Sequence, residues 1–294
     1  MKQKIQILDT TLREGEQTPG VSFKISQKIQ IVKLLNQFGV DYIEVGHPVV
    51  SKDIFSFINK VSKLKLNAKI IAHSRLLKKD IDKVIELNIP WIGLFFDLCE
   101  NHFKRKYRVS EKRALEMIGD SISYAKKHKL KVRFTAEDAS RTNFNFLIKV
   151  AKLIEKAGAD RFSFADTVGI LHPFKVNDIF SRLVSELKIP IHGHFHNDFG
   201  LATANALQAF QSGASCIDVT VNGLGERCGI SSLAELAASL DELLNVKNSW
   251  NFKILKDISS YVDKISNISH DDTRPVTGKN AFTHNGGLHV SSAI

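Results

Sequence analysis

The stretch Ile7-Leu-Asp-Thr-Thr-Leu-Arg-Glu-Gly-Glu-Gln17 runs from apolar residues straight into a dense polar cluster. We interpret its first residues as a buried β-strand and its polar residues as the loop that follows the strand. A doubly wound sheet normally carries a glycine-rich dinucleotide turn at this point, and Thr10-Thr-Leu-Arg-Glu14 does not resemble such a turn. The stretch therefore favours the other common parallel architecture, a closed barrel.

Short apolar segments alternate with longer amphipathic segments along the whole chain. The expected strands are residues 4–9, 41–46, 68–73, 90–96, 131–136, 160–165, 190–195 and 216–221. The expected helices are residues 26–38, 53–64, 79–87, 111–128, 144–157, 173–187, 203–212 and 232–244. Because strict alternation produces a parallel sheet and eight such units close on themselves, the sequence predicts an α/β fold of the (β/α)8 TIM-barrel type.

The last part of the chain lies outside this count of eight units. We expect the catalytic barrel to occupy residues 1–248 and residues 249–294 to form the start of a small C-terminal subdomain or a linker. A helix is expected at residues 252–265, and turn-forming and polar residues follow it from 269 to 275. The segment then continues through the glycine-containing residues 278–289.

The composition indicates the environment of the protein. The net charge is +10 and the isoelectric point is about 9.4, but most basic residues are lysines scattered over presumptive helix faces. We therefore expect no nucleic-acid partner. One denser basic cluster, residues 102–108, is interpreted as a solvated loop or as a contact for the phosphates of coenzyme A.

Cysteine usage and hydropathy point to the same cellular location. The three cysteines, Cys99, Cys216 and Cys228, show no CxxC spacing, which fits a reducing cytoplasm rather than a disulfide framework. No run approaches the eighteen apolar residues that a membrane helix needs, and the N-terminus does not resemble a secretory signal. We expect a soluble cytoplasmic protein without a membrane partner.

Two histidines near the end of the seventh expected strand form a candidate metal site. In Ile191-His-Gly-His-Phe-His-Asn-Asp198, His194 and His196 stand at alternate positions, so their imidazoles share one face and can bind one divalent ion. A carboxylate from residues 9–16 would complete a set of three ligands that leaves positions open for water or substrate. The alternative is a pair of hydrogen-bonded histidines and a salt-bridged turn, and His192 is expected to be structural.

Polar side chains follow all eight expected strands. In a TIM barrel the carboxyl ends of the strands meet at one face, where the active sites of this fold lie. For each of these residues alone, a structural hydrogen bond is the alternative. Because polar residues stand at the ends of all eight expected strands, we predict a functional site at this face. The glycines of residues 222–229 indicate a loop with positive φ angles or a close ligand approach. The strand-end residues are Asp9, Arg13, Glu14, Glu44, His47, His73, Arg75, Asp97, Glu100, Arg133, Thr135, Glu137, Asp138, Asp166, Thr167, His194, His196, Asn197, Asp198, Asn222, Glu226 and Arg227.

Five motifs, in order along the chain, resemble those of the acyl-CoA-dependent 2-oxoacid synthases. This family comprises the homocitrate, isopropylmalate and citramalate synthases, a branch of the metal-dependent barrel group that also contains HMG-CoA lyase. The resemblance covers nearly the whole chain and implies a transferase that condenses acetyl-CoA with a 2-oxoacid, in amino-acid biosynthesis and specifically lysine biosynthesis. The motifs are Leu8-Asp-Thr-Thr-Leu-Arg-Glu-Gly-Glu-Gln-Thr-Pro-Gly-Val21, Phe134-Thr-Ala-Glu-Asp-Ala-Ser-Arg141, Ala165-Asp-Thr-Val-Gly169, His194-Phe-His-Asn-Asp-Phe-Gly-Leu-Ala202 and Asn222-Gly-Leu-Gly-Glu-Arg-Cys-Gly-Ile230.

The resemblance implies roles for individual residues. Glu14, His194 and His196 would be the ligands of a divalent metal, Mg²⁺, Mn²⁺ or Zn²⁺, and the 2-oxoacid would chelate this metal. Arg13 would have a catalytic and substrate-binding role, because its permanent charge would stabilise the negative charge that develops on the keto oxygen.

Proton transfer is assigned by the resemblance to His289, with Glu137 as its acidic partner. In this family the histidine comes from a neighbouring subunit, so we expect a homodimer, with a further C-terminal segment or a companion chain as an open alternative. His289 lies five residues before position 294, and we therefore expect the chain as written to bind metal and 2-oxoacid but to condense acetyl-CoA poorly. A non-catalytic or split barrel is the alternative.

The expected 2-oxoacid is 2-oxoglutarate, which would give homocitrate and CoA. His47, His73 and Arg133 resemble the pattern of the homocitrate-forming members, in which the last two would meet the distal carboxylate of the substrate. Ile230 supports this choice, because isopropylmalate synthases usually have asparagine there.

Other activities within the same barrel group remain open. Thr135 and Thr167 are further expected substrate contacts, and they do not distinguish the substrates. Isopropylmalate or citramalate synthesis is the alternative to homocitrate synthesis. HMG-CoA cleavage is disfavoured, because the cysteine-bearing loop of the lyases differs from Gly225-Glu-Arg-Cys-Gly229.

Overall fold

The computed structural model describes residues 5–100, 103–268 and 271–284. Within these residues the strands pair in chain order, all in parallel, and the last strand returns to the first to close the barrel. This confirms the predicted (β/α)8 fold. The strands are β1 (Gln6–Asp9), β2 (Tyr42–Glu44), β3 (Lys69–Ser74), β4 (Trp91–Asp97), β5 (Lys131–Glu137), β6 (Arg161–Asp166), β7 (Ile191–Phe195) and β8 (Cys216–Val219).

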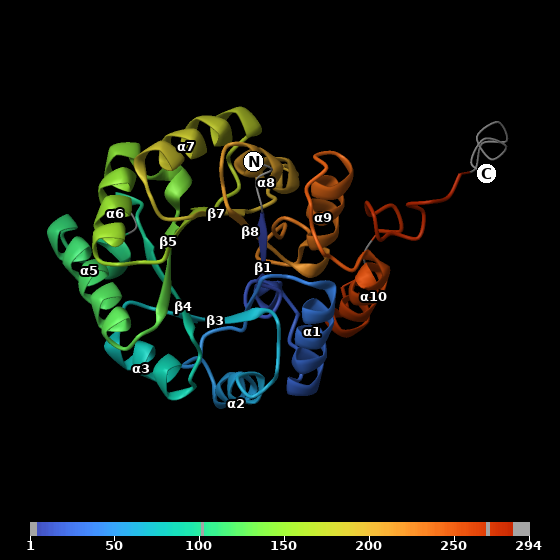
Figure 1. Ribbon diagram of the computed structural model, residues 1–294, viewed down its shortest axis with the longest axis horizontal. Coiled ribbons are helices and arrows are strands. Elements are labelled where there is room, and N and C mark those ends of the chain that lie inside the picture. The colour runs from blue at the N-terminus through green and yellow to red at the C-terminus, as the bar shows by residue number, and fades with distance from the viewer. Residues whose placement is uncertain (1–4, 101–102, 269–270, 285–294) are drawn as a thin grey trace.

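The helices surround the strands as an outer ring (Figure 1). Polar side chains start several of them, since Ser51, Ser110 and Asn143 each accept hydrogen bonds from backbone N–H groups of the first turn. None of the described helices is both long and apolar enough to span a bilayer. The helices of the ring are α1 (Ile25–Phe38), α2 (Lys52–Val61), α3 (Lys78–Glu86), α5 (Glu111–Lys127), α6 (Phe144–Lys156), α7 (Pro173–Glu186), α8 (Ala202–Gln211) and α9 (Leu233–Glu242).

Two strands are shorter than their apolar runs suggest. The strand expected at 41–46 ends at Glu44, because Gly46 turns the chain with a φ of +99°. The strand expected at 216–221 ends at Val219, because Val221–Gly223 forms a short 3₁₀ turn in which Asn222 has a φ of +61°. Both differences are at strand ends, where loop geometry overrides the apolar pattern.

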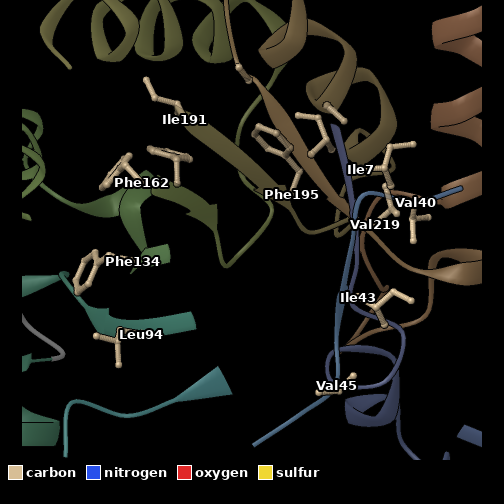
Figure 2. Packing of buried hydrophobic residues seen from close by; sticks show 14 of the residues in the cluster. Ile7, Val40, Ile43, Val45, Leu94, Phe134, Phe162, Ile191, Phe195 and Val219 are labelled. Atoms are coloured by element: carbon tan, nitrogen blue, oxygen red, sulfur yellow. The ribbon is translucent and has the colours of Figure 1, made fainter. Parts of the chain in front are cut away.

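The hydrophobic core lies between the strands and the helices. Figure 2 shows Leu94, Phe134, Phe162, Ile191 and Phe195 as part of this buried cluster, each carried by one of the strands. Because successive side chains of a strand point to opposite faces, the neighbours of these residues point into the barrel. The inner face of the barrel can therefore be polar while the outer face remains apolar.

The beginning of the barrel is filled by packed side chains. The Arg161 guanidinium lies 5.0 Å from the ring centre of Tyr42 and 5.5 Å from that of Trp91. It also bonds to Gln6 and to the Nε2 of His192. His192 is fully buried here, in agreement with the structural role expected for it. A functional site is therefore expected at the opposite end of the barrel, where the strands end.

The chain continues past the barrel helices and packs back onto the barrel. Helix α10 (Leu255–Ser266) lies beside α1 (Figure 1). The ring of Trp250 stacks on Phe38 at 6.3 Å, and Phe252 meets the same ring edge-on at 6.0 Å. The first part of the expected subdomain is thus held by α1, and the boundary expected at residue 248 stays a prediction.

Candidate metal centre and active-site cavity

Glu14, His194 and His196 come together where β1 and β7 end. The Nε2 atoms of the two histidines lie 3.4 Å apart, and the Nε2 of His196 lies 4.0 Å from Oε1 of Glu14. One ligand atom from each residue lies within 4.8 Å of the other two, and all three residues are buried. Since metal bonds of about 2.1 Å separate adjacent ligand atoms by roughly 3–4 Å, this group has the dimensions of a metal site.

Further side chains orient two of these three residues. Asp218, on β8, places Oδ2 3.2 Å from Nδ1 of His194, which leaves the Nε2 of this histidine for a metal. Glu14 accepts a hydrogen bond from Arg13 through Oε2 and one from the backbone N–H of Glu226 through Oε1. The group therefore has the outer hydrogen bonds that commonly fix metal ligands in proteins.

The protonation states of the group suit metal binding. Burial lowers the pKa of His196 to about 3, so this imidazole is neutral at physiological pH. Burial on its own would raise the pKa of Glu14, but Arg13, the two histidines and the hydrogen bond from Glu226 together outweigh this effect, and the pKa lies below its ordinary value. A neutral imidazole and an ionised carboxylate are the forms that bind a divalent cation.

Glu44, at the end of β2, is the centre of a buried ion-pair network beside the metal group. Its Oε2 lies 2.7 Å from Nε of Arg13 and 2.7 Å from the hydroxyl of Thr10. Its Oε1 lies 3.3 Å from Nη1 of Arg133 and 3.2 Å from Nδ1 of His73. This carboxylate therefore joins the loop after β1 to the end of β3 and to the first half of β5.

Arg133 completes the network across the barrel. It is 1% exposed, and its Nη2 bonds to Oδ2 of Asp218 and to the hydroxyl of Ser163. Its positive charge is thus matched by two carboxylates, those of Glu44 and Asp218. Its Nε makes no hydrogen bond within the described residues.

A cavity of about 450 Å³ opens at this end of the barrel. It brings together all the described residues that the sequence assigned to metal binding, substrate binding or catalysis. Those residues are Arg13, Glu14, His73, Arg133, Thr135, Glu137, Thr167, His194 and His196. A cavity lined by a possible metal site, two arginines and several neutral donors can hold a small anionic ligand.

Of the two expected proton-transfer residues, the structure describes Glu137. The carboxylate of Glu137 lines the cavity from β5, and its Oε1 lies 3.5 Å from Nζ of Lys106. Burial raises its pKa above the ordinary value, which suits a group that has to carry a proton. His289 lies outside the described residues.

The two threonines occupy different environments within the cavity. The hydroxyl of Thr135 is buried and makes no hydrogen bond within the described residues, so it is available to a ligand. The hydroxyl of Thr167 accepts a hydrogen bond from the backbone N–H of Asp138 at 2.8 Å. Thr167 can still donate its own proton to a ligand.

The glycines after β8 allow the loop to approach the metal group. Gly223 and Gly229 have φ angles of +69° and +82°, and a Cβ on Gly229 would lie 1.8 Å from the carbonyl oxygen of Gly223. A Cβ on Gly225 would lie 3.0 Å from Oε1 of Glu14. The expectation of positive φ angles in this loop is therefore confirmed, and the close approach of a ligand stays a prediction. The exposed Cys228 does not line the cavity.

Asp218 is a residue of the network that sequence reasoning missed. It stands within the run Cys216-Ile-Asp-Val219, inside an expected strand, and was not among the strand-end candidates. A single acidic side chain inside an otherwise apolar strand is the signal that marks it, because parallel strands are normally apolar throughout.

Comparisons with known proteins agree with this geometry. The sequence pattern of the family described as HMGL-like matches residues 4–262. The chain belongs to the HMGL-like family. Over 99% of its length this HMGL-like chain is 47% identical to a protein named homocitrate synthase from Sulfurisphaera tokodaii and 45% identical to one from Saccharolobus solfataricus.

The comparisons differ in the share of each matched protein that the chain covers. The HMGL-like chain spans 64% of the length of the two curated relatives. Among solved structures it resembles an HMG-CoA lyase from Bacillus subtilis, with a TM-score of 0.81 at 20% sequence identity, over 95% of this chain and 97% of the lyase chain. At this level of identity, the likeness establishes the barrel fold alone.

Proposed function

We propose that this protein condenses acetyl-CoA with 2-oxoglutarate to give homocitrate and CoA. The observation that carries the proposal is the single cavity in which the metal group Glu14, His194 and His196 lies with His73 and Arg133. The similarity to proteins named homocitrate synthase supports the same substrates.

The group of two imidazoles and one carboxylate fits a divalent cation, Mg²⁺, Mn²⁺ or Zn²⁺. Such a cation, when bound, would polarise the keto group of the substrate as a Lewis acid. Arg13, fixed by Glu14 and Glu44, would place its charge where the keto oxygen becomes negative. Glu137 would hold or deliver a proton from the β5 side, and we propose His289 as its partner.

The polar residues of the cavity would select the oxoacid. We propose that His73 and Arg133 bind the distal carboxylate, and that Thr135 and Thr167 donate hydrogen bonds to the substrate. The unpaired Nε of Arg133 and the unpaired hydroxyl of Thr135 support these assignments. A charge-assisted contact contributes roughly 1.5–3 kcal/mol, which corresponds to about one to two decades of affinity.

Isopropylmalate synthesis is the second candidate, and one observation favours it. Leu12, Val50 and Ile54 also line the cavity, so a branched aliphatic substrate would find apolar contacts there. Arg133 lines the same cavity, and its positive charge favours a substrate with a second carboxylate.

We also propose a cellular location, an oligomeric state and a pathway for the protein. The cysteines Cys99, Cys216 and Cys228 are free thiols, which supports a location in the reducing cytoplasm. We propose a homodimer in which His289 serves the neighbouring subunit. We also propose that the product enters lysine biosynthesis, as homocitrate-forming activity implies.

The test is calorimetric titration of the metal-loaded protein with 2-oxoglutarate, 2-oxoisovalerate and pyruvate, followed by a thiol-release assay with acetyl-CoA. We expect 2-oxoglutarate to bind most tightly of the three oxoacids. His289→Ala should remove thiol release and leave oxoacid binding unchanged. Tighter binding of 2-oxoisovalerate would assign the protein to isopropylmalate synthesis instead.

A further inference from the structure

His73 has an unusual position among the residues of the cavity. Its ring stacks on Phe95, with centroids 4.4 Å apart and an interplanar angle of 10°. On one edge its Nδ1 lies 3.2 Å from Oε1 of Glu44, and the ring itself lines the cavity. The ring is thus fixed in orientation by a stacking partner and by a carboxylate.

The partners of Glu44 determine which ring nitrogen carries the proton. This carboxylate accepts hydrogen bonds from Thr10, Arg13 and Arg133, and it is fully buried. Although burial alone would raise its pKa, Arg13, His73 and Arg133 together hold the pKa of Glu44 well below its ordinary value. An ionised carboxylate can only accept, so Nδ1 of His73 must donate.

The other nitrogen of His73 has no proton in the neutral ring. Nε2 makes no hydrogen bond to any of the described residues, and in this tautomer it carries a lone pair. A lone pair repels a carboxylate instead of binding it. Turning the ring over would break the bond to Glu44, so a substrate carboxylate can be bound through Nε2 only if this atom gains a proton.

The charged and titratable groups that face His73 come from β2 and β5 and from the loops after β1 and β2. Glu44 on β2 favours a proton on the ring, whereas Arg13 after β1 and Arg133 on β5 oppose it. His47, after β2, lies with its ring centre 6.4 Å away, and Phe95 on β4 carries no charge. Burial has the largest effect, and it lowers the pKa of His73 below the ordinary value. The ring is therefore neutral before a ligand enters.

We propose that His73 takes up one proton from solvent when a dicarboxylic 2-oxoacid enters the cavity, and that the resulting imidazolium binds the second carboxylate through Nε2. This inference rests on the proposed function, because it requires a substrate with a second carboxylate near His73. In this binding step one proton leaves the solvent and becomes the Nε2–H of His73 in the bound state. A monocarboxylic oxoacid supplies no negative charge at that position and brings no proton.

The proposal predicts how affinity depends on pH. The pKa of His73 is higher with the dicarboxylic ligand bound than without it, so binding is strongest below both values and weakens as pH rises between them. Within that interval the dissociation constant should rise about tenfold for each pH unit. For pyruvate, which lacks the second carboxylate, we expect no such dependence on His73.

The experiment is calorimetric titration of the metal-loaded protein with 2-oxoglutarate and with pyruvate at pH 7.5, in two buffers of different ionisation enthalpy. The difference between the two buffers gives the number of protons taken up. We expect 2-oxoglutarate to take up about one proton more than pyruvate does. Subtracting the pyruvate value removes proton changes that arise at the metal, since both ligands have the same 2-oxoacid group.

Two variants identify the residue that takes up the proton. His73→Gln offers an amide donor that does not titrate, so it should abolish the additional uptake, while His47→Gln should retain it. Folding of both is checked by circular dichroism and metal content. If 2-oxoglutarate does not bind the parent protein, the proposed function fails. If it binds without additional uptake, or if His73→Gln retains the uptake, the proposed function stands and this inference is wrong.

Discussion

Two candidate metal ligands are the ends of one buried chain of alternating charges. Each link is a hydrogen bond or an ion pair between side chains, and every link except the one between Arg13 and Glu14 joins residues far apart in the sequence. Because a buried charge is costly unless it is paired, removing any inner member would leave a neighbour uncompensated. The position of one candidate metal ligand therefore depends on residues on the other side of the barrel. Its members, in order, are Glu14, Arg13, Glu44, Arg133, Asp218 and His194.

The first prediction concerns Asp218, which holds Nδ1 of His194. Asp218→Asn removes the carboxylate that fixes this ring, and we expect metal affinity to fall by about 10- to 100-fold, as for other hydrogen-bond partners of metal-bound histidines. The measurement is competition for metal with a chromogenic chelator. Asp160→Asn is the matched control, because Asp160 pairs with Lys126 and Lys131 outside the cavity. Equal affinities of the two variants would contradict the role given to Asp218.

At the scale of the element, β7 combines a metal-binding face with a packing face. His192, His194 and His196 alternate with Gly193 and Phe195, and Phe195 belongs to the outer core (Figure 2). The glycine leaves room for the neighbouring ring, because a Cβ at this position would lie 2.6 Å from Cε2 of Phe195. The packing of the outer face therefore restrains the histidines on the inner face.

The second prediction concerns Gly193. Gly193→Ala forces the ring of Phe195 to move within a close-packed core, and we expect a loss of about 1–3 kcal/mol in the free energy of unfolding. Urea denaturation measures it. Gly119→Ala is the control, because its Cβ would lie 4.0 Å from the nearest atom and it stands inside helix α5. There we expect a gain of up to about 1 kcal/mol from helix propensity. If Gly193→Ala left the free energy of unfolding unchanged, the core around Phe195 would have adjusted to the added methyl group, and the prediction would be wrong.

At the scale of the whole molecule, the stability of the barrel depends on pH through a buried group outside the cavity. Asp9 is fully buried at the end of β1, and its Oδ2 makes no hydrogen bond within the described residues. Leu8 belongs to the inner layer, so Asp9 points to the outer, helix-facing side. Burial raises the pKa of this carboxyl to about 7. The folded state therefore retains a proton that the unfolded chain releases near pH 4.

The third prediction follows from the sign of this shift. A pKa raised on folding means that the contribution of Asp9 to stability is fully present below pH 3.8 and is lost as pH rises towards 7. Asp9→Asn lacks this loss, so its stability relative to the parent should increase by about 1.4 kcal/mol per pH unit across that interval. Denaturant unfolding at pH 5 and pH 7 measures the difference. Parallel pH profiles of parent and variant would contradict the assignment.

The order of strands and helices, and the end of the barrel at which most candidate site residues lie, could be predicted from the sequence. The period of the apolar residues distinguishes strands from helices, and the polar residues at the strand ends meet because all strands run in the same direction. His194 and His196 could be paired from their spacing alone, since alternate residues of a strand share a face. Glu14 was assigned through the resemblance to the family, because several carboxylates of residues 9–16 were equally suitable.

Which of these residues pair with one another depends on the closed barrel. Arg133 is separated by 85 residues from Asp218 and by 89 from Glu44, and no local pattern relates them. The closure of the barrel brings them within hydrogen-bond distance, and burial then requires their charges to be matched. Sequence reasoning could therefore place Arg133 in the cavity. The neutralisation of its charge, the role of Asp218 and the tautomer of His73 depend on distances that exist only after the eight strands have closed.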